Sequence, residues 1–377
     1  MNRSWKIAVV ALVLAVGLLT PGCESRTEYV LGAVLPLSGS GASYARDIKQ
    51  GIELGLEEIN AAGGIDGLPL RVIFEDSGSD PSNALAAATR LMDEERVPAI
   101  IGGVLSSETL AIAPVAEEKE VVLLSPASSS PDITGAGNFI FRVYPSDVVE
   151  GTMMADFMLN VLGKSRIMIL AVNNEYGRGL KTVFAKRYRS VPNREIIEVI
   201  NFDQGQVDWS EEVAQIQEMG PDGIYLVGYP AEMLSFLEAM QEANAKYPIL
   251  ASRSFDVEMM KVPAAEGVIF PRDLFDPERT EVAGKFAEAY RSRYSEAPSI
   301  WAANGYDAVN LLADAMTDSG YRAEPIRVWL TQVRELPGAS GIITFDRQGD
   351  VQKTPVISIV HNGEFITYNE YKEMVGK

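Results

Sequence analysis

Short apolar segments alternate with amphipathic segments along most of this chain, and this alternation restricts its possible folds more than any other feature. In the first part, apolar runs occupy Tyr29–Leu35, Leu70–Glu75, Ala99–Ile101 and Val121–Leu124. Helical segments are expected between them, and Asp80 followed by Pro81 is typical of an N-cap and a first helical residue. Strands covered by helices on both faces have this unbroken apolar character. The pattern therefore predicts an α/β fold with parallel sheets.

The alternation begins again after a compact boundary near residues 144–147. Strands are expected over 167–172, 195–202, 223–227, 249–251 and 267–270, with helices over 151–162, 179–189, 209–219 and 231–245. Helices over 280–294 and 302–319 and strands over 341–345, 356–360 and 364–368 complete the chain. Its 377 residues exceed what one core usually accommodates. We therefore expect two hinged α/β lobes, with a ligand at the carboxyl ends of their strands.

The N-terminus has the layout of a secretory signal over residues 1–22. Arg3 and Lys6 precede the apolar run Ile7–Leu19, which is shorter than the roughly 20 residues that a membrane-spanning helix needs. Cys23, the only cysteine, follows the small residue Gly22 and resembles the acylation site of a lipoprotein. We expect Cys23 to carry a lipid that anchors the exported chain in the periplasm or on the outer face of the cell membrane. The alternatives are a free thiol after ordinary cleavage and an uncleaved anchor.

Charge and residue counts exclude several functional classes. The chain has 52 acidic against 33 basic side chains and a net charge of −19, which argues against binding of nucleic acid or anionic lipid. One cysteine permits no disulfide within the chain. The single histidine, His361, lies in an expected turn, so histidine-based catalytic triads and zinc sites are excluded or strained. We expect no enzyme activity, metal or cofactor.

Small hydroxyl residues follow two neighbouring strands. Ser106 and Ser107 open a helix after the strand at 99–101, and Ser128 and Ser129 belong to a serine-rich loop after the strand at 121–124. Free backbone N–H groups and the helix dipole favour an anion at such a helix start. Helix capping by the two serines is the simpler explanation for Ser106 and Ser107. The neighbouring serine loop at the same sheet edge favours a carboxylate site instead.

Three tyrosines occupy loops after strands. Tyr44 is placed in the first strand-to-helix loop, Tyr176 in a loop after the strand at 167–172, and Tyr229 in a loop after the strand at 223–227. Rigid aromatic rings suit the apolar body of a ligand, and each hydroxyl offers one polar contact. Three tyrosines at equivalent places indicate a binding cleft more strongly than one would.

Taken in order, these motifs resemble the branched-chain amino-acid binding proteins of ABC importers. The likeness covers nearly all of residues 29–370. It rests on Gly32–Gly39 with Tyr44, Ile59–Ile65, Asp80-Pro81, Ile101-Gly102 with Ser106-Ser107, Ser125–Ala127, Tyr176-Gly177, Gly305–Ala308, Phe345-Asp346 and Gly349-Asp350. The resemblance implies a type I periplasmic-binding fold: two doubly wound parallel-sheet lobes joined by a three-crossover hinge.

The resemblance also implies roles for individual residues. The carboxylate of the ligand would contact Ser106 and Ser129, and its ammonium group would contact the carbonyl of Ala127 and an acidic residue of the second lobe. The position expected for that acid holds Arg253. An arginine cannot pair with an ammonium group, and it suits a second carboxylate or a polar oxygen. Either Asp147 or Asp256 replaces the missing acid, or the ligand lacks an amino group or carries an extra acid; an Arg253 directed to solvent at the rim is a further alternative.

We therefore expect a monomeric, lipid-anchored solute-binding protein that delivers an amino acid or related small carboxylate to ABC permease subunits. Residues 29–146 and 273–350 would form the N-terminal lobe, and residues 147–272 and 351–377 the C-terminal lobe. The alternatives are a ligand-sensing partner of a receptor and a binder of dicarboxylates or aromatic acids.

Overall fold

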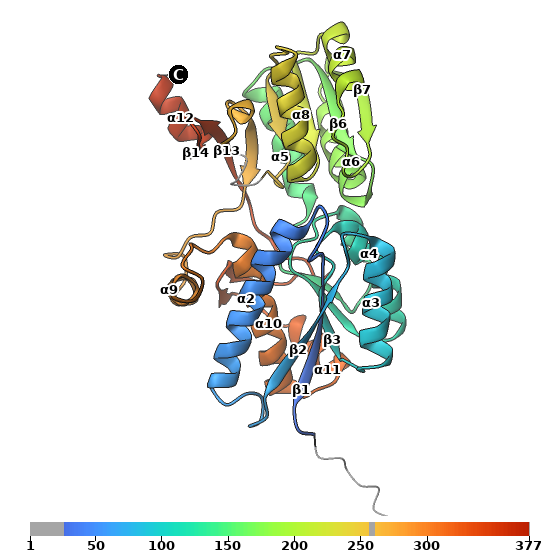
Figure 1. Cartoon of the computed structure of the whole chain (residues 1–377), viewed down its shortest axis with the longest axis vertical. Coiled ribbons are helices and arrows are strands. Elements are labelled where there is room, and N and C mark those ends of the chain that lie inside the picture. Colours follow the sequence, from blue (N-terminus) through green and yellow to red (C-terminus); the bar gives the residue numbers. More distant parts are fainter. Residues whose placement is uncertain (1–25, 256–260, 377) are drawn as a thin grey trace, which may run out of the picture.

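Two α/β lobes lie one above the other in the computed structural model, which describes residues 26–255 and 261–376 (Figure 1). The signal segment, Cys23 and Asp256 lie outside the described residues. The lower lobe contains a parallel sheet in the order β2-β1-β3-β4-β5. Its strands are β1 (Tyr29–Leu35), β2 (Leu70–Asp76), β3 (Ala99–Gly102), β4 (Val122–Ser125) and β5 (Ile140–Arg142).

The second sheet has the order β14-β13-β10-β9-β8-β6-β7. Its parallel strands are β6 (Arg166–Val172), β7 (Glu195–Phe202), β8 (Gly223–Val227), β9 (Ile249–Ala251) and β10 (Ile269–Arg272). Two antiparallel strands, β13 (Val356–His361) and β14 (Glu364–Thr367), extend one edge. All residues of β6 after Arg166 are fully buried, as expected for a strand covered on both faces. The predicted α/β class with two parallel sheets is confirmed.

Helices cover both sheets. In the lower lobe they are α2 (Ala42–Ala61), α3 (Pro81–Asp93), α4 (Ser106–Glu118), α9 (Glu281–Tyr294), α10 (Ile300–Ser319) and α11 (Ala323–Leu330). In the upper lobe they are α5 (Asp147–Asn160), α6 (Glu175–Arg189), α7 (Ser210–Met219), α8 (Pro230–Glu242) and the C-terminal α12 (Tyr368–Val375). Short 3₁₀ turns η1 (Pro131–Ile133) and η3 (Pro263–Ala265) and a hairpin of β11 (Leu336–Gly338) and β12 (Gly341–Ile343) complete the fold.

The chain passes between the lobes three times: after β5, after β10 and after β12. A buried ion pair links the first and third passages. Asp350 Oδ1 accepts a hydrogen bond from Arg142 Nε at 2.6 Å, and Asp350 Oδ2 accepts one from Nη2 at 2.8 Å. Arg142 Nη1 also donates to the carbonyl of Ser130 at 2.9 Å. The same guanidinium therefore fixes both the hinge and the serine loop after β4.

Two glycines let α2 and α10 cross closely in the lower lobe. A Cβ at Gly51 would lie 1.9 Å from the carbonyl oxygen of Ala302, and a Cβ at Gly305 would lie 2.2 Å from that of Ile48. Both distances are far below van der Waals contact, so only glycine fits. This crossing holds the start of α10, and with it Trp301, beside the start of α2.

Several elements differ from the sequence-based expectation. Helices α5 and α6 were expected from Gly151 and Gly179 but begin four residues earlier, after the N-caps Ser146 and Asn174. Consequently Tyr176 lies in the first turn of α6 rather than in a loop. Tyr44, which was also expected in a loop, lies in the first turn of α2. Strands β5 and β11 and helices α11 and α12 were not predicted at all.

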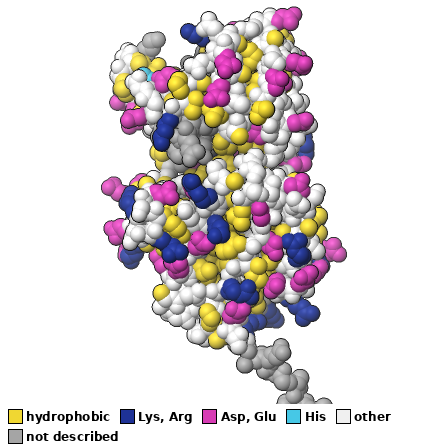
Figure 2. All heavy atoms as spheres, in the orientation of Figure 1, with side chains coloured by type: hydrophobic (Ala, Val, Ile, Leu, Met, Phe, Trp, Pro, Cys, Tyr) yellow, Lys and Arg dark blue, Asp and Glu magenta, His cyan; other side chains and the backbone are white. Residues whose placement is uncertain are grey.

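No helix in the described ranges is both long and apolar enough to cross a membrane. Figure 2 shows acidic side chains spread over both lobes on the visible face instead of forming one patch.

Candidate ligand-binding site

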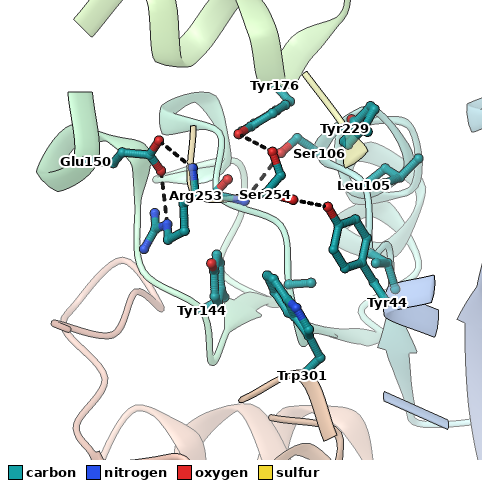
Figure 3. A pocket seen from close by; sticks show the side chains of 13 residues that line it. Tyr44, Leu105, Ser106, Tyr144, Glu150, Tyr176, Tyr229, Arg253, Ser254 and Trp301 are labelled. Carbon is teal, nitrogen blue, oxygen red and sulfur yellow. Dashed lines mark hydrogen bonds and ion pairs between the residues drawn. The ribbon is translucent and has the colours of Figure 1, made fainter. Parts of the chain in front are cut away.

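A pocket lies between the lobes, where the carboxyl ends of strands from both sheets meet (Figure 3). Seven of the nine residues expected to bind ligand line it: Tyr44, Ser106, Ala127, Ser129, Tyr176, Tyr229 and Arg253. The lining is completed by Val104, Leu105, Tyr144, Glu150, Ser254 and Trp301. The lobes touch across this pocket, because the Tyr44 hydroxyl donates to the carbonyl of Ser254 at 2.8 Å.

The N-terminus of α4 forms one end of the pocket, and a buried glutamate rather than a serine caps it. Glu108 Oε2 accepts the N–H groups of Val104 and Leu105, both at 3.1 Å, and Oε1 accepts the Ser77 hydroxyl at 2.6 Å. Burial raises the pKa of Glu108 to about 7, against the opposing effect of these hydrogen bonds. The simpler explanation, in which Ser106 and Ser107 cap α4 with their side chains, is therefore wrong.

The hydroxyl of Ser106 serves the pocket instead. Its Oγ accepts the backbone N–H groups of Ser129 at 3.3 Å and Ser130 at 3.1 Å, which leaves its proton for another acceptor. The N–H groups of Ser106 and Ser107 belong to the first turn of α4 and have no carbonyl partner within a helix. This end therefore offers several donors to an anion.

Two expected site residues do not line the pocket. Ser107 is buried in the first turn of α4. Ser128 Oγ donates to the carbonyl of Gly103 at 2.8 Å and lies 2.6 Å from Thr109 Oγ, so it braces the loops behind the pocket. Their contact with a ligand stays a prediction.

Aromatic rings form the walls. Tyr176 and Tyr229 stack with their centroids 5.5 Å apart, and the Tyr176 hydroxyl lies 3.2 Å from Ser254 Oγ. On the opposite wall, the ring centroid of Trp301 lies 5.0 Å from that of Tyr44 and 4.8 Å from that of Tyr144. Sequence reasoning missed Trp301 and Tyr144. A tryptophan next to the helix start Ser299-Ile300, and a tyrosine inside the proposed boundary, were the available signals.

Arg253 lies inside a cluster of three carboxylates at the other end of the pocket. Its Nε donates to Glu150 Oε2 at 3.0 Å, and its two Nη atoms lie 3.3 Å from Asp147 Oδ1 and from Asp273 Oδ2. The guanidinium also lies 4.6 Å from the centre of the Tyr144 ring. Arg253 is only 5 % exposed, so its expected alternative as a rim residue directed to solvent is wrong.

Three carboxyl groups surround one guanidinium in this cluster. Burial raises the pKa of Glu150 to about 8 and also raises that of Asp147, although the nearby Arg253 charge opposes both shifts. Asp147 Oδ2 is buried and has no hydrogen-bond partner in the described structure. Sequence reasoning missed Glu150 because it placed the start of α5 at Gly151; the N-cap Ser146 followed by acidic residues was the available signal. This end of the pocket therefore favours a cation.

The described ranges 26–255 and 261–376 contain no group of three or more His, Cys, Asp or Glu side chains arranged to hold a metal ion. The site is instead a set of donors, aromatic walls and carboxylates between two lobes. This arrangement suits noncovalent capture of a small solute with an anionic end and a cationic end.

Comparison with known proteins agrees with this architecture. A family model described as a periplasmic binding protein matches residues 28–357. The crystal structure of a leucine binding protein from Thermotoga maritima has a TM-score of 0.83 and 32 % identity, covering 90 % of this chain and 97 % of that chain. A branched-chain amino acid transporter substrate binding protein from Streptococcus pneumoniae, solved with isoleucine, has a TM-score of 0.81 and 26 % identity, with the same coverage.

A sequence relative points the same way. The leucine-, isoleucine-, valine-, threonine- and alanine-binding protein of Pseudomonas aeruginosa is 24 % identical over 346 residues, which are 90 % of this chain and 88 % of that protein. These relatives are named as binding proteins and not as enzymes. The chain therefore belongs to the periplasmic binding protein family and has the type I fold of the branched-chain amino-acid binding proteins.

Proposed function

We propose that this protein captures an amino acid between its two lobes and delivers it to the permease of an ABC importer. The observation that carries the proposal is the polarity of the pocket. One end presents hydroxyl and N–H donors around Ser106 and Ser129, and the other presents the carboxylates around Arg253. An α-amino acid has the matching pair of charges.

The donor end suits the carboxylate of the ligand. A carboxylate there would accept the Ser106 hydroxyl proton and the first N–H groups of α4, and it would gain from the helix dipole. Ser129 and the backbone of Ala127 lie next to it in the lining. No arginine is needed to hold the acid.

The acidic end suits an ammonium group. Three carboxyl groups surround the guanidinium of Arg253, and burial raises the pKa of Glu150 and Asp147. A ligand cation would favour the ionised forms of these two groups and pair with them. Glu150 lines the pocket, and Asp147 contributes the carboxylate oxygen without a partner. We propose that these two acids replace the acidic residue missing at position 253. A dicarboxylate or an aromatic acid without an amine would bring no compensating charge.

The remaining parts of the proposal concern the whole chain. We propose a lower lobe of residues 29–146 and 273–350 and an upper lobe of residues 147–272 and 351–377, which close on the ligand. A lipid on Cys23 would hold the exported protein at the membrane. The anchored segment would then lead into the start of β1. The pocket lies at the other end of this strand, about 20 Å away.

Matched ligands test the proposal. Calorimetry with the chain lacking residues 1–23 would compare L-leucine with 4-methylpentanoate, which lacks the amine, and 3-methylbutylamine, which lacks the acid. We expect micromolar or tighter binding of L-leucine or another aliphatic amino acid and at least a tenfold weaker interaction with both analogues. Equal affinity for 4-methylpentanoate would contradict the role of Glu150 and Asp147.

A further inference from the structure

The two lobes also touch outside the pocket, at a glycine in the middle of a helix. Gly179 of α6 is buried against η1 of the lower lobe. A Cβ added to Gly179 would lie 2.7 Å from Pro131 Cδ, 3.0 Å from Ser130 Oγ and 3.7 Å from Pro131 Cγ. All three nearest atoms therefore belong to the other lobe, and one is part of a rigid proline ring.

This contact is linked directly to the pocket on both sides. Gly179 follows Tyr176 by three residues, so both lie on the same face of α6. Across the interface, Ser130 and Pro131 follow Ser129, and the carbonyl of Ser130 is held by Arg142. A change in the spacing between α6 and η1 would therefore move Tyr176 relative to Ser129, and these two residues line the pocket from different lobes.

The fold of the upper lobe does not require glycine at position 179. Gly177 provides the contrast, because its Cβ would lie 1.9 Å from the carbonyl oxygen of Val172 in the same lobe. Gly179 meets no such obstacle inside its own lobe among its three nearest atoms. Glycine in a helix interior is otherwise unfavourable relative to alanine. Contact with the lower lobe is what accounts for it here.

We propose that Gly179 is an affinity-determining residue although it does not line the pocket. Its missing side chain lets α6 approach η1 closely enough for Tyr176 and Ser254 to reach the ligand and for Tyr44 to bond to Ser254. The inference rests on the proposed capture of a solute between the lobes. It identifies position 179 as the place where a side chain would limit how far the lobes close.

Gly179→Ala tests this inference, because it should weaken ligand binding without destabilising the ligand-free protein. A folding defect would lower the stability as well. L-Leucine serves as the probe, and Gly284→Ala is the matched control, because Gly284 is also inside a helix and its added Cβ meets only the carbonyl oxygen of Pro277 at 3.3 Å. The ligand-free Gly179→Ala protein should unfold at the same or a higher urea concentration than the parent. Its Kd for L-leucine should rise about 5- to 150-fold, the range given by overpacking costs of about 1–3 kcal/mol.

The dissociation rate and a second substitution, Pro131→Ala, distinguish overpacking between the lobes from other causes of weaker binding. The loss should lie mainly in a faster dissociation rate, because only the closed complex is affected. Adding Pro131→Ala removes Cδ and Cγ, so it should restore most of the affinity lost in Gly179→Ala. Unchanged affinity in Gly179→Ala, or a lower unfolding midpoint with no recovery on adding Pro131→Ala, would overturn the inference.

A readout without ligand separates this inference from the proposed function. Gln204 Nε2 of the upper lobe lies 2.6 Å from Ser40 Oγ of the lower lobe. The pair Ser40→Cys and Gln204→Cys, in the chain without residues 1–23, can be joined by a short bis-maleimide when the lobes are closed. Gly179→Ala should slow this cross-linking several-fold and Gly284→Ala should not. Equal rates would refute the role of Gly179 whichever solute the protein binds, whereas failure of L-leucine and other amino acids to bind would refute only the proposed function.

Discussion

Glu150→Gln is the substitution that tests the acidic end of the pocket most directly. In the structure, Glu150 Oε2 accepts Arg253 Nε and Oε1 accepts the backbone N–H of Arg253, both at 3.0 Å. Glutamine keeps the length of the side chain but removes its charge and replaces one accepting oxygen with an NH₂ group. A charge-assisted hydrogen bond to a ligand ammonium contributes about 1.5–3 kcal/mol. The Kd for L-leucine should therefore rise roughly 10- to 150-fold.

Protons provide a second readout of the same group. Burial raises the pKa of Glu150 to about 8, so at pH 7 the ligand-free carboxyl holds its proton most of the time. A bound ammonium favours the ionised form, and up to about one proton should be released per ligand. Calorimetry in buffers with different ionisation enthalpies measures this release at pH 7. Glu150→Gln should remove it.

The same pKa shift has a consequence for folding. The pKa of Glu150 is higher in the folded protein than its ordinary value of 4.5, so the folded state binds this proton more tightly than the unfolded chain. The resulting stabilisation is complete below pH 4.5 and is lost as the pH rises towards about 8. Urea denaturation across this range should show a flatter pH dependence for Glu150→Gln than for the parent protein.

Glu232→Gln is the matched control for these measurements. Glu232 is also buried in the upper lobe, burial raises its pKa, and it accepts the N–H of Gly205 at 2.7 Å, but it does not line the pocket. Its substitution should leave leucine affinity and proton release unchanged. If Glu150→Gln binds L-leucine within about twofold of the parent and releases the same number of protons, the assignment of the amine end to Glu150 is refuted.

Three other substitutions test the rest of the site and the hinge. Ser106→Ala combined with Ser129→Ala should weaken leucine binding by about 1–3 kcal/mol in calorimetry, and unchanged affinity would remove the proposed carboxylate anchor. Arg253→Met leaves three buried carboxylates without their cation and should lower the free energy of unfolding by about 3–5 kcal/mol, with the largest loss at high pH; a loss that is the same at pH 5 and pH 8 would contradict this account. Asp350→Asn removes the charge that pairs with the buried Arg142, and it should lower the free energy of unfolding in urea by a similar amount. A loss under about 1 kcal/mol would show that this pair does not hold the hinge.

Much of the fold was predictable because local signals and burial agree. The apolar runs at residues 29–35 and 223–227 became strands β1 and β8 with the expected bounds. Asp80 caps α3 as expected, since its side chain accepts the N–H groups of Ser82 and Asn83, both at 2.9 Å. The turn between β13 and β14 also agrees, because Asn362 and Gly363 both have positive φ, as a tight hairpin requires.

Helix starts were less predictable where a glycine allows close packing instead of marking the end of a helix. Helices α5 and α6 were expected to begin at Gly151 and Gly179, yet both residues, together with Gly177, lie inside helices. Gly177 allows close contact with Val172, and Gly151 with Val183. Glycine that admits a neighbouring element cannot be distinguished in one sequence from glycine that ends a helix. That error placed Tyr176 in a loop and left Glu150 outside its helix.

The charge preference of the pocket could not be predicted because it belongs to a cluster and not to one residue. Considered alone, Arg253 favours an acidic ligand group. The structure brings it together with Asp147 and Glu150 of α5 and with Asp273 after β10. The acids of α5 and Asp273 are separated along the chain by more than a hundred residues. With three carboxylates around one guanidinium, the same position favours a cation. A relative that keeps the arginine but lacks two of these acids should therefore select ligands of the opposite charge, so specificity in this family has to be inferred from the whole ion cluster.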